Sequence, residues 1–318
     1  MNPEKKGAAL CRSSILKSIH EVGRELKKHR FVYFLSLLVA GYFFIFNYIP
    51  MYGVTIAFKN FSVKKGILGS DWVGLKYFRE FFKSYYFTRT VTNTFLMSLY
   101  GLLWGFPAPI LLALLLNEVK TNWFKRTIQT ATYLPYFVST VVIAGIIRIF
   151  LATNGVVNQF IQAFGGNASN LLAIPEYFRT IIISTNIWTS VGFGSILYLA
   201  ALTAIDPGLY DAASIDGAGR MRKIWHISIP GIMNVVIIML IFACGSLLSV
   251  NGEKILLLYN ESTYKTADVI ATFTYRKGLV ENNFSYSTAV GLFNSLVNFI
   301  LLVVTNYIAG RSSEYSLW

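Results

Sequence analysis

One polar stretch of the chain, 206–230, carries most of the residues whose types and spacing indicate a specific task. It reads DPGLYDAASIDGAGRMRKIWHISIP. Asp206 can cap the N-terminus of a helix that has Pro207 at its first position. Gly217 and Gly219 permit the positive φ at which a helix ends and the chain reverses. The stretch therefore predicts a short helix followed by a tight turn.

A second short amphipathic helix is expected over 221–225, and it leads to Pro230 near the start of a long apolar run. Ala212 and Ala213 are small enough to let another surface come close to the first helix. The chemistry indicated is the docking of a partner on a helix–turn–helix that lies parallel to a membrane. A plain linker of the same composition is the alternative.

Catalysis and metal binding find no support in the rest of the sequence. The three histidines are scattered at positions 20, 29 and 226. Cys11 and Cys244 have neither the spacing of a metal site nor that of a disulfide framework. The sequence contains no Ser/His/Asp set and no glycine-rich phosphate loop. It therefore predicts no catalytic residue, no metal site and no cofactor, and each histidine is expected to be an ordinary surface residue.

Composition identifies the elements that must position the polar stretch. Of the 318 residues, 54% belong to the set AVILMFWYC and only 14% are charged, and the mean hydropathy is +0.53. Soluble proteins carry about 25% charged residues. Because so few charges cannot cover a molecule of this size in water, the chain is expected to be an integral membrane protein.

Six apolar stretches are long enough to span a bilayer, since a spanning helix needs roughly 20 mostly apolar residues. They are 31–57, 94–116, 133–151, 178–202, 227–250 and 288–309. The expected fold class is all-α, a polytopic membrane protein with six transmembrane helices. These bounds divide the chain into an N-terminal segment 1–30, a six-span domain 31–310 and a C-terminal tail 311–318.

The distribution of basic residues predicts the orientation of the spans. The net charge is +13, and eight of the 28 Lys and Arg residues precede the first apolar stretch. Basic residues are retained on the cytoplasmic side and attract anionic lipid. We therefore expect both termini in the cytoplasm, a basic amphipathic segment over 1–30, and contact with membrane lipid instead of nucleic acid. In the first outer loop, aromatic residues at helical spacing predict a short interfacial helix over 72–82.

The charges inside the six stretches argue against one class of transporter. They are limited to Arg148 and, near an outer span end, Arg179. Transporters driven by protons or sodium usually need an intramembrane carboxylate to bind the coupling ion. The sequence therefore disfavours secondary transport.

The stretch 206–230 resembles the EAA loop of ABC importer membrane subunits, whose pattern is Glu-Ala-Ala, Asp-Gly-Ala, an aromatic residue and Ile-x-Leu-Pro. The matching residues are Asp211-Ala212-Ala213, Asp216-Gly217-Ala218, Trp225 and Ile227-Ser228-Ile229-Pro230. Asp211 replaces the Glu of the pattern and preserves its charge, and Ile229 replaces the Leu and preserves its apolar character. The resemblance implies coupling to a separate ATPase through Asp211, Ala212, Ala213, Asp216, Gly217, Ala218, Trp225 and Pro230.

Other segments of the sequence are similar to segments of permeases in the carbohydrate branch of this family. They are Trp72-Val73-Gly74-Leu75 with Tyr77-Phe78, Asn186-Ile187-Trp188 with Tyr198-Leu199, and Ser246 through Asn260. The second segment resembles the maltose importer's larger membrane subunit, and the third resembles permeases for larger oligosaccharides in Gram-positive bacteria. Together they imply a type I ABC importer permease fold in a bacterial cell membrane.

The resemblance also implies a substrate site and partners. The implied substrate-lining residues are Asn186, Thr189, Ser190, Phe193, Ser246 and Ser249. Amides and hydroxyls bond sugar hydroxyls, and an aromatic face stacks on the C–H side of a sugar. The implied partners are a second homologous permease subunit in a heterodimer, two copies of a cytoplasmic ABC ATPase, an extracellular solute-binding lipoprotein and an oligosaccharide.

The sequence alone leaves alternatives to these roles open. Which of the residues around Gly245, Ser246 and Ser249 match the family's substrate-lining positions depends on whether one counts forward from Pro230 or back from Asn260. Small polar residues such as these also serve to pack spanning helices together. The same machinery could carry another solute, such as a peptide or a lipid-linked sugar. A membrane glycosyl- or acyltransferase would need an acid/base pair or a nucleophile near the interface, and no such pair is visible.

Overall fold

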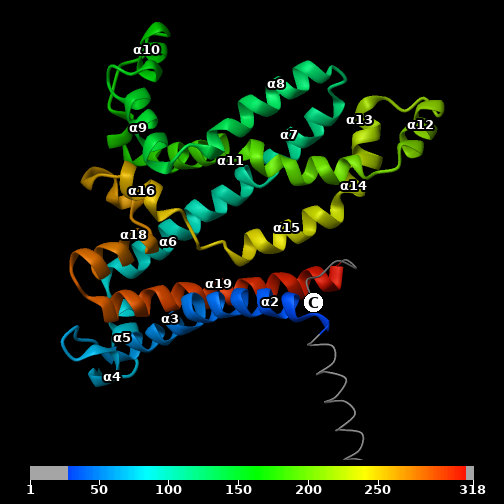
Figure 1. Cartoon of the computed structure of the whole chain (residues 1–318). Coiled ribbons are helices and arrows are strands. Elements are labelled where there is room, and N and C mark those ends of the chain that lie inside the picture. The colour runs from blue at the N-terminus through cyan, green and yellow to red at the C-terminus, as the bar shows by residue number, and fades with distance from the viewer. Residues whose placement is uncertain (1–27, 313–318) are drawn as a thin grey trace, which may run out of the picture. The chain divides into compact units, whose positions relative to one another are not determined.

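The computed structural model describes residues 28–312, which are mainly helical and fall into two compact units (Figure 1). The first unit comprises residues 28–55 and 63–69, and the second comprises 56–62 and 70–312. The N-terminal segment 1–30 and the tail 311–318 lie almost entirely outside the described residues. The first unit contains α2 Arg30–Phe43, the π-helical turn η1 Phe44–Tyr48, α3 Ile49–Met51 and α4 Gly66–Gly69.

The second unit begins with one short antiparallel pairing and is helical from there on. The 3-10 helix η2 Tyr52–Phe58 leads into it, and β1 Lys59–Asn60 pairs with β2 Asp71–Trp72. The elements that follow are α5 Lys76–Lys83, α6 Tyr85–Tyr100, η3 Gly101–Gly105, α7 Pro107–Glu118, α8 Asn122–Tyr133, η4 Leu134–Phe137, α9 Thr140–Leu151, α10 Val156–Ala163, η5 Leu171–Ala173, α11 Pro175–Thr203, α12 Pro207–Ile215, α13 Arg220–Lys223, η6 Ile224–Ser228, α14 Ile229–Gly231, α15 Met233–Gly245, α16 Gly252–Leu258, η7 Glu261–Thr263, α17 Tyr264–Ala267, α18 Ile270–Tyr275, η8 Arg276–Val280 and α19 Phe284–Ser312.

The described residues contain the helices that six spans require. Five of them are long and apolar enough to cross a membrane, namely Arg30–Phe58, Tyr85–Glu118, Thr140–Ala163, Pro175–Thr203 and Phe284–Arg311. A sixth candidate is a bent pair, Arg220–Gly231 and Met233–Gly245, whose two halves differ in direction by 62°. Each expected stretch overlaps one of these six, and the all-α fold class is confirmed.

The third expected span, 133–151, begins later than predicted. Its first residues form the end of α8 and the 3-10 turn η4, which contains the buried Pro135. Val138 is extended, and the α-helix starts at Thr140, where the side chain of Ser139 accepts a hydrogen bond from the backbone of Val142. Proline lacks the backbone N–H that a continuous helix would need at that point, so the helix is interrupted there.

The fifth expected span, 227–250, is bent and ends early. The chain leaves helical geometry at Ile232, with φ −104° and ψ 4°. The helix α15 ends at Gly245, which packs against Leu302 of α19 so closely that a Cβ atom there would lie 2.5 Å from the Leu302 Cδ1 atom. Residues 246–250 are therefore turns and irregular backbone, which corrects the expectation that this stretch is helical.

Three π-helical turns precede prolines within long helices. The turns η1, η3 and η6 end two residues before Pro50, Pro107 and Pro230, respectively. A proline ring collides with the carbonyl of the residue four positions earlier and offers no N–H to it. A widened turn re-satisfies the freed backbone groups locally, so the helix continues through the proline inside an apolar span.

The helix α11 is the central packing element of the second unit. It lies against α7 and α8 (Figure 1). Its Gly192 allows this approach, because a Cβ atom there would lie 2.1 Å from the carbonyl oxygen of Thr132. Towards the N-terminus of α11, Phe178 and Ile182 are fully buried in a core cluster that also contains Ile255 of α16. These contacts fix the position of α11 against the segments that surround the cavity described below.

The predicted outer helix forms over Lys76–Lys83, while Trp72 belongs to β2 instead. Its Tyr77 and Phe81 are buried, and the Phe81 ring lies 6.3 Å from the ring of Tyr286 in α19. The buried part of its aromatic face thus packs on protein and is not available to the headgroup layer.

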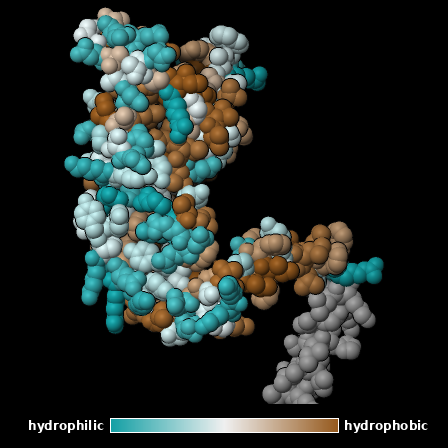
Figure 2. Space-filling view, turned by 90° about the vertical axis from the view of Figure 1, so that its left-hand side faces the viewer, coloured by the Kyte–Doolittle hydropathy of each residue, from teal (hydrophilic) through white to brown (hydrophobic). Residues whose placement is uncertain are grey.

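Many large apolar side chains remain exposed on the long helices, among them Leu111, Leu115, Phe299 and Ile300. On the face drawn in Figure 2, hydrophobic residues gather in broad areas beside hydrophilic ones. Contiguous exposed apolar surface of this kind is typical of a protein that meets lipid or a partner protein.

Candidate functional site

The loop between α11 and α15 contains the predicted pair of short helices (Figure 1). Asp206 caps α12, since its Oδ1 atom accepts a 2.9 Å hydrogen bond from the backbone N–H of Gly208, and Pro207 is the first helical residue. Gly217 has φ +74° and ends the helix. The N–H of Ala218 donates to the carbonyl of Ala213 at 2.8 Å, the bond that defines a Schellman turn. The predicted cap and turn are confirmed.

Two details of this loop differ from the sequence prediction. Gly219 has φ −70°, so positive φ occurs at Gly217 alone of the two glycines. The second helix does not end near Trp225; it begins at Arg220 and continues through η6 and α14 to Gly231. The physical reason is the π-helical turn ahead of the proline in α14, which lets the chain stay helical.

Side-chain hydrogen bonds hold the two short helices together. The Tyr210 hydroxyl lies 3.0 Å from the hydroxyl of Ser228, which is buried, and the Lys223 Nζ atom donates to the Ser214 hydroxyl at 2.6 Å. These bonds tie α12 to α13 and to η6, the first part of the bent span. A displacement of α12 would therefore be transmitted to the bent span through these hydrogen bonds.

The predicted coupling residues lie on or near the surface of this loop. Asp211, Ala212, Asp216, Gly217, Trp225 and Pro230 are exposed, and Ala213 and Ala218 are half-buried. A hollow of about 290 Å³ separates the two short helices and is lined by Ala213, Asp216, Ala218, Arg222, Lys223, His226 and Ile227. Exposed apolar side chains stand beside it, with Ile215 88% and Trp225 64% exposed. Such a mixture of apolar and charged groups around a hollow suits a protein partner.

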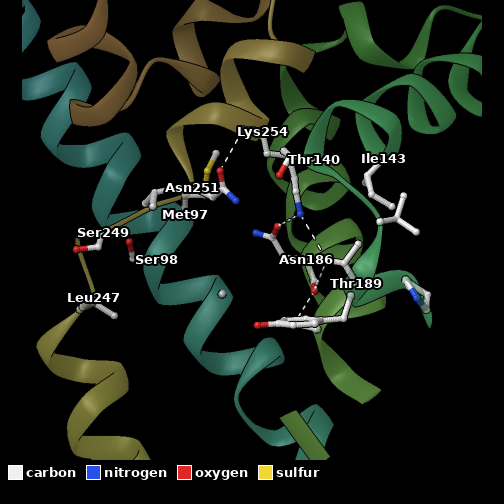
Figure 3. A pocket seen from close by; sticks show the side chains of 16 residues that line it. Met97, Ser98, Thr140, Ile143, Asn186, Thr189, Leu247, Ser249, Asn251 and Lys254 are labelled. Atoms are coloured by element: carbon white, nitrogen blue, oxygen red, sulfur yellow. Dashed lines mark hydrogen bonds between the residues drawn. The ribbon is translucent and has the colours of Figure 1, made fainter. Parts of the chain in front are cut away.

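The second candidate region is a cavity of about 450 Å³ in the second unit (Figure 3). It is lined by α6, the segment 135–143, α11, the irregular residues 247–251 and α16. Four of the six residues predicted to line a substrate site do line it, namely Asn186, Thr189, Ser190 and Ser249.

The other two predicted residues do not line this cavity. Phe193 stacks on Tyr136, with ring centroids 4.0 Å apart and planes inclined by 5°, and Tyr136 is the ring that lines the cavity. Ser246 donates its hydroxyl to the carbonyl of Phe242 at 3.0 Å. It follows the last residue of α15 and directly precedes Leu247, which does line the cavity.

The position of Ser249 depends on a contact that is remote in sequence. Asn298 of α19 accepts a 2.9 Å hydrogen bond from the backbone N–H of Leu248 and donates to the Ser249 hydroxyl at 3.0 Å. These two bonds satisfy backbone and side-chain groups of a segment that has left helical geometry. The irregular segment is therefore an ordered wall of the cavity.

The charge in the cavity comes from Lys254, which the sequence analysis did not select as a site residue. Its side chain is only 5% exposed, and its Nζ atom donates to Asn186 Oδ1 at 2.7 Å and lies 3.5 Å from Thr189 Oγ1 (Figure 3). Burial lowers the pKa of Lys254 from its ordinary value, because removal from water disfavours the charged form. Asn251 orients this segment, since its side chain accepts a 3.1 Å hydrogen bond from the Lys254 backbone N–H.

The polar groups of the cavity can recognise a ligand by hydrogen bonding. The hydroxyls of Thr189 and Ser190 donate to backbone carbonyls of their own helix, at 3.0 and 2.7 Å, so toward a ligand they act as acceptors. Thr189 uses part of this capacity on Lys254. Asn186 accepts from Lys254, which leaves its NH₂ group as a donor. Donors, acceptors and an aromatic ring in one cavity suit a polyhydroxylated molecule.

Comparison with known proteins agrees with this arrangement. Residues 105–313 match the family described as binding-protein-dependent transport system inner membrane component. Protein LplB of Bacillus subtilis is 42% identical, and the polygalacturonan/rhamnogalacturonan transport system permease protein YteP of the same organism is 41% identical; each match covers 92% of this chain and 92% of the relative.

A solved structure has the same fold as this chain. It is a chain of a bacterial ABC transporter involved in the import of the acidic polysaccharide alginate, with a TM-score of 0.85, 39% sequence identity, and coverage of 92% of this chain and 99% of that one. The chain therefore belongs to the family of binding-protein-dependent transport system inner membrane components, and it is a membrane transport component of the ABC type, not an enzyme.

Proposed function

We propose that this chain is the transmembrane permease subunit of an ABC importer that moves an oligosaccharide into the cell and is driven by a separate ATPase docked on the loop 206–230. The observation that carries the proposal is the cavity of about 450 Å³, in which Asn186, Thr189, Ser190 and Ser249 come together beside the Tyr136 ring. The names of the similar proteins, which concern polygalacturonan, rhamnogalacturonan and alginate, support a carbohydrate as the transported solute.

The assembly proposed for this chain has four kinds of partner. They are a second homologous permease subunit, two copies of a cytoplasmic ABC ATPase, an extracellular solute-binding protein and the oligosaccharide. The alginate transporter has been solved in complex with a periplasmic protein that holds an alginate pentasaccharide, which supports a binding-protein partner. The basic residues before α2 support cytoplasmic termini, and relatives from Bacillus support a Gram-positive cell membrane as the location.

ATP hydrolysis should depend on the partners. The sequence has no phosphate-binding loop, so we expect the purified single chain to be inactive and the co-expressed complex to hydrolyse ATP faster when oligosaccharide-loaded binding protein is added. The measurement is phosphate release from each preparation in proteoliposomes. ATPase activity of the single chain would contradict the proposal.

Substrate contact at Asn186 is tested by Asn186→Ala. Loss of a buried hydrogen-bonding group costs about 1–3 kcal/mol, so we expect oligosaccharide uptake to fall by about tenfold or more while the complex still assembles. The matched control is Ser184→Ala, because Ser184 lies on the same helix but outside this cavity. Uptake in Asn186→Ala equal to that in the control would refute the contact.

A further inference from the structure

Lys254 is a buried cation with neutral partners. It is 5% exposed, and the groups that meet its Nζ atom are the amide oxygen of Asn186 and the hydroxyl of Thr189. Among the residues that the structure describes, no Asp or Glu lines the cavity, and no carboxylate forms an ion pair with Lys254. Burying a charge is unfavourable unless an opposite charge or strong hydrogen bonds compensate for it.

Two other partly buried cations of the second unit share one anion. Arg89 and Arg276 both pair with the buried carboxylate of Asp268, at 2.6 and 2.8 Å. Arg179, which is also partly buried, donates instead to the amide oxygen of Asn93 at 2.7 Å. Lys254 has no anion as partner either, and it lines the space of about 450 Å³ that a ligand can enter.

The neighbours of Lys254 add further hydrogen-bond donors to the same space. Asn186 and Asn251 each use the side-chain oxygen within the protein, the first on Lys254 Nζ and the second on the Lys254 backbone N–H. Their NH₂ groups therefore remain as donors. Ser98 also lines the cavity, but its hydroxyl oxygen is buried beneath the lining surface. An ammonium group with neighbouring N–H donors complements a carboxylate, which only accepts.

We propose that the transported oligosaccharide is acidic and that Lys254 binds a carboxylate of one of its sugar units inside the cavity. This inference rests on the proposed function, because it names the substrate class of the same cavity. The positive charge and the NH₂ groups of Asn186 and Asn251 compensate the carboxylate, while Ser190 and the Tyr136 ring meet the neutral part of the sugar. A neutral oligosaccharide would leave the Lys254 ammonium with neutral partners only.

The test is direct binding to the purified detergent-solubilised complex without its extracellular binding protein, which has a specificity of its own. The probes are a galacturonate trisaccharide and the same trisaccharide with its carboxyl groups reduced to alcohols. Hydrogen bonds to charged groups are stronger than those between neutral groups, so we expect the wild-type complex to bind the acidic probe at least about tenfold more tightly than the reduced one. Lys254→Gln should remove this preference, and Lys254→Arg should restore part of it.

The control variant is Lys265→Gln, which removes the same charge from an exposed position outside the cavity and should leave the preference intact. A preference that survives in Lys254→Gln, or a wild-type complex that binds the reduced probe as tightly as the acidic one, would overturn the inference while leaving oligosaccharide import standing. Binding of neither trisaccharide would contradict the proposed function itself. If acetate displaced the acidic probe at similar concentrations, the site would hold a free carboxylate without recognising the sugar, and the inference would also fall.

Discussion

Asp268→Ala is expected to destabilise the folded protein by about 3–5 kcal/mol, because removal of one partner from a buried ion pair leaves an uncompensated charge. Asp268 is fully buried, and its Oδ2 atom accepts from Arg89 at 2.6 Å and from Arg276 at 2.8 Å. Without the carboxylate, two partly buried guanidinium groups would lie close together with no anion between them. Their mutual repulsion adds to the lost attraction.

The carboxylate also organises the backbone around it. Its Oδ1 atom accepts from the Thr272 hydroxyl at 3.0 Å, and the same hydroxyl oxygen accepts from the N–H of Val269 at the start of α18. The carbonyl of Asp268 accepts from Asn93, which in turn holds Arg179 of α11 at 2.7 Å. Asp268 therefore links α6 to the start of α18 directly and to α11 through Asn93, so its loss should affect more than one ion pair.

The measurement is the thermal midpoint of the purified protein in detergent, together with the amount recovered as a single species. The matched control is Glu281→Gln, which breaks the exposed Lys277–Glu281 pair of 2.6 Å and should cost about 0–1 kcal/mol. Asp268→Asn keeps an acceptor for Thr272 and should fall between the two. If Asp268→Ala melted at the same temperature as Glu281→Gln, the cluster would contribute no more than a surface pair.

The sequence predicted the helices better than their ends. Apolar runs identified all six candidate spans, because the need to bury about 20 apolar residues in lipid is a property of composition. The bounds failed near prolines and at Gly245. Near the prolines, π-helical turns and a 3-10 turn decided the backbone, and a count of apolar residues does not report them. At Gly245, close contact with Leu302 decided it, and that contact depends on a residue that is far away in the sequence.

The residues that line the cavity could likewise be predicted only in part from the sequence. Asn186, Thr189 and Ser190 lie on one helix, and their spacing alone places them on neighbouring turns. Ser249 joins them only because Asn298, on the last helix, holds its segment. Lys254 was not selected as a site residue because basic residues in the loops of a membrane protein usually report orientation. A Lys directly before the apolar run Ile255–Leu258 was the one local signal of its burial.

Gly217→Val is expected to leave the protein in the membrane while detaching or uncoupling the ATPase. Gly217 has φ +74°, and a Cβ atom there would meet no other atom within 4 Å. The penalty of the substitution is therefore one of backbone conformation and not of collision. A side chain at positive φ costs about 1–2 kcal/mol, and a β-branched one fits least well there. The folded spans do not depend on this exposed turn, so insertion should be preserved.

The consequence for coupling follows from the geometry of the loop. Gly217 sets the direction in which the chain leaves α12 and enters α13, and the bonds Tyr210–Ser228 and Lys223–Ser214 require that direction. A penalty of about 1–2 kcal/mol reduces the population of the native turn by roughly 5–30-fold relative to its alternatives. Both short helices would then present their exposed side chains in a different arrangement to the partner.

Gly219→Val provides the matched control, because Gly219 is equally exposed, has the same open space at its Cβ position and has φ −70°, which any residue adopts. We measure co-purification of the ATPase and oligosaccharide-dependent ATP hydrolysis in both variants and in Asp211→Ala. Removing a charge from a partly buried interface can cost about 2–5 kcal/mol of binding free energy. Because Asp211 supplies a single contact, we expect Asp211→Ala to impair ATPase coupling less than Gly217→Val, which redirects the whole loop. Equal losses in the two glycine variants would mean that added bulk, and not the turn, impairs docking. Wild-type coupling in both Gly217→Val and Asp211→Ala would mean that the stretch 206–230 is only a linker between two spans.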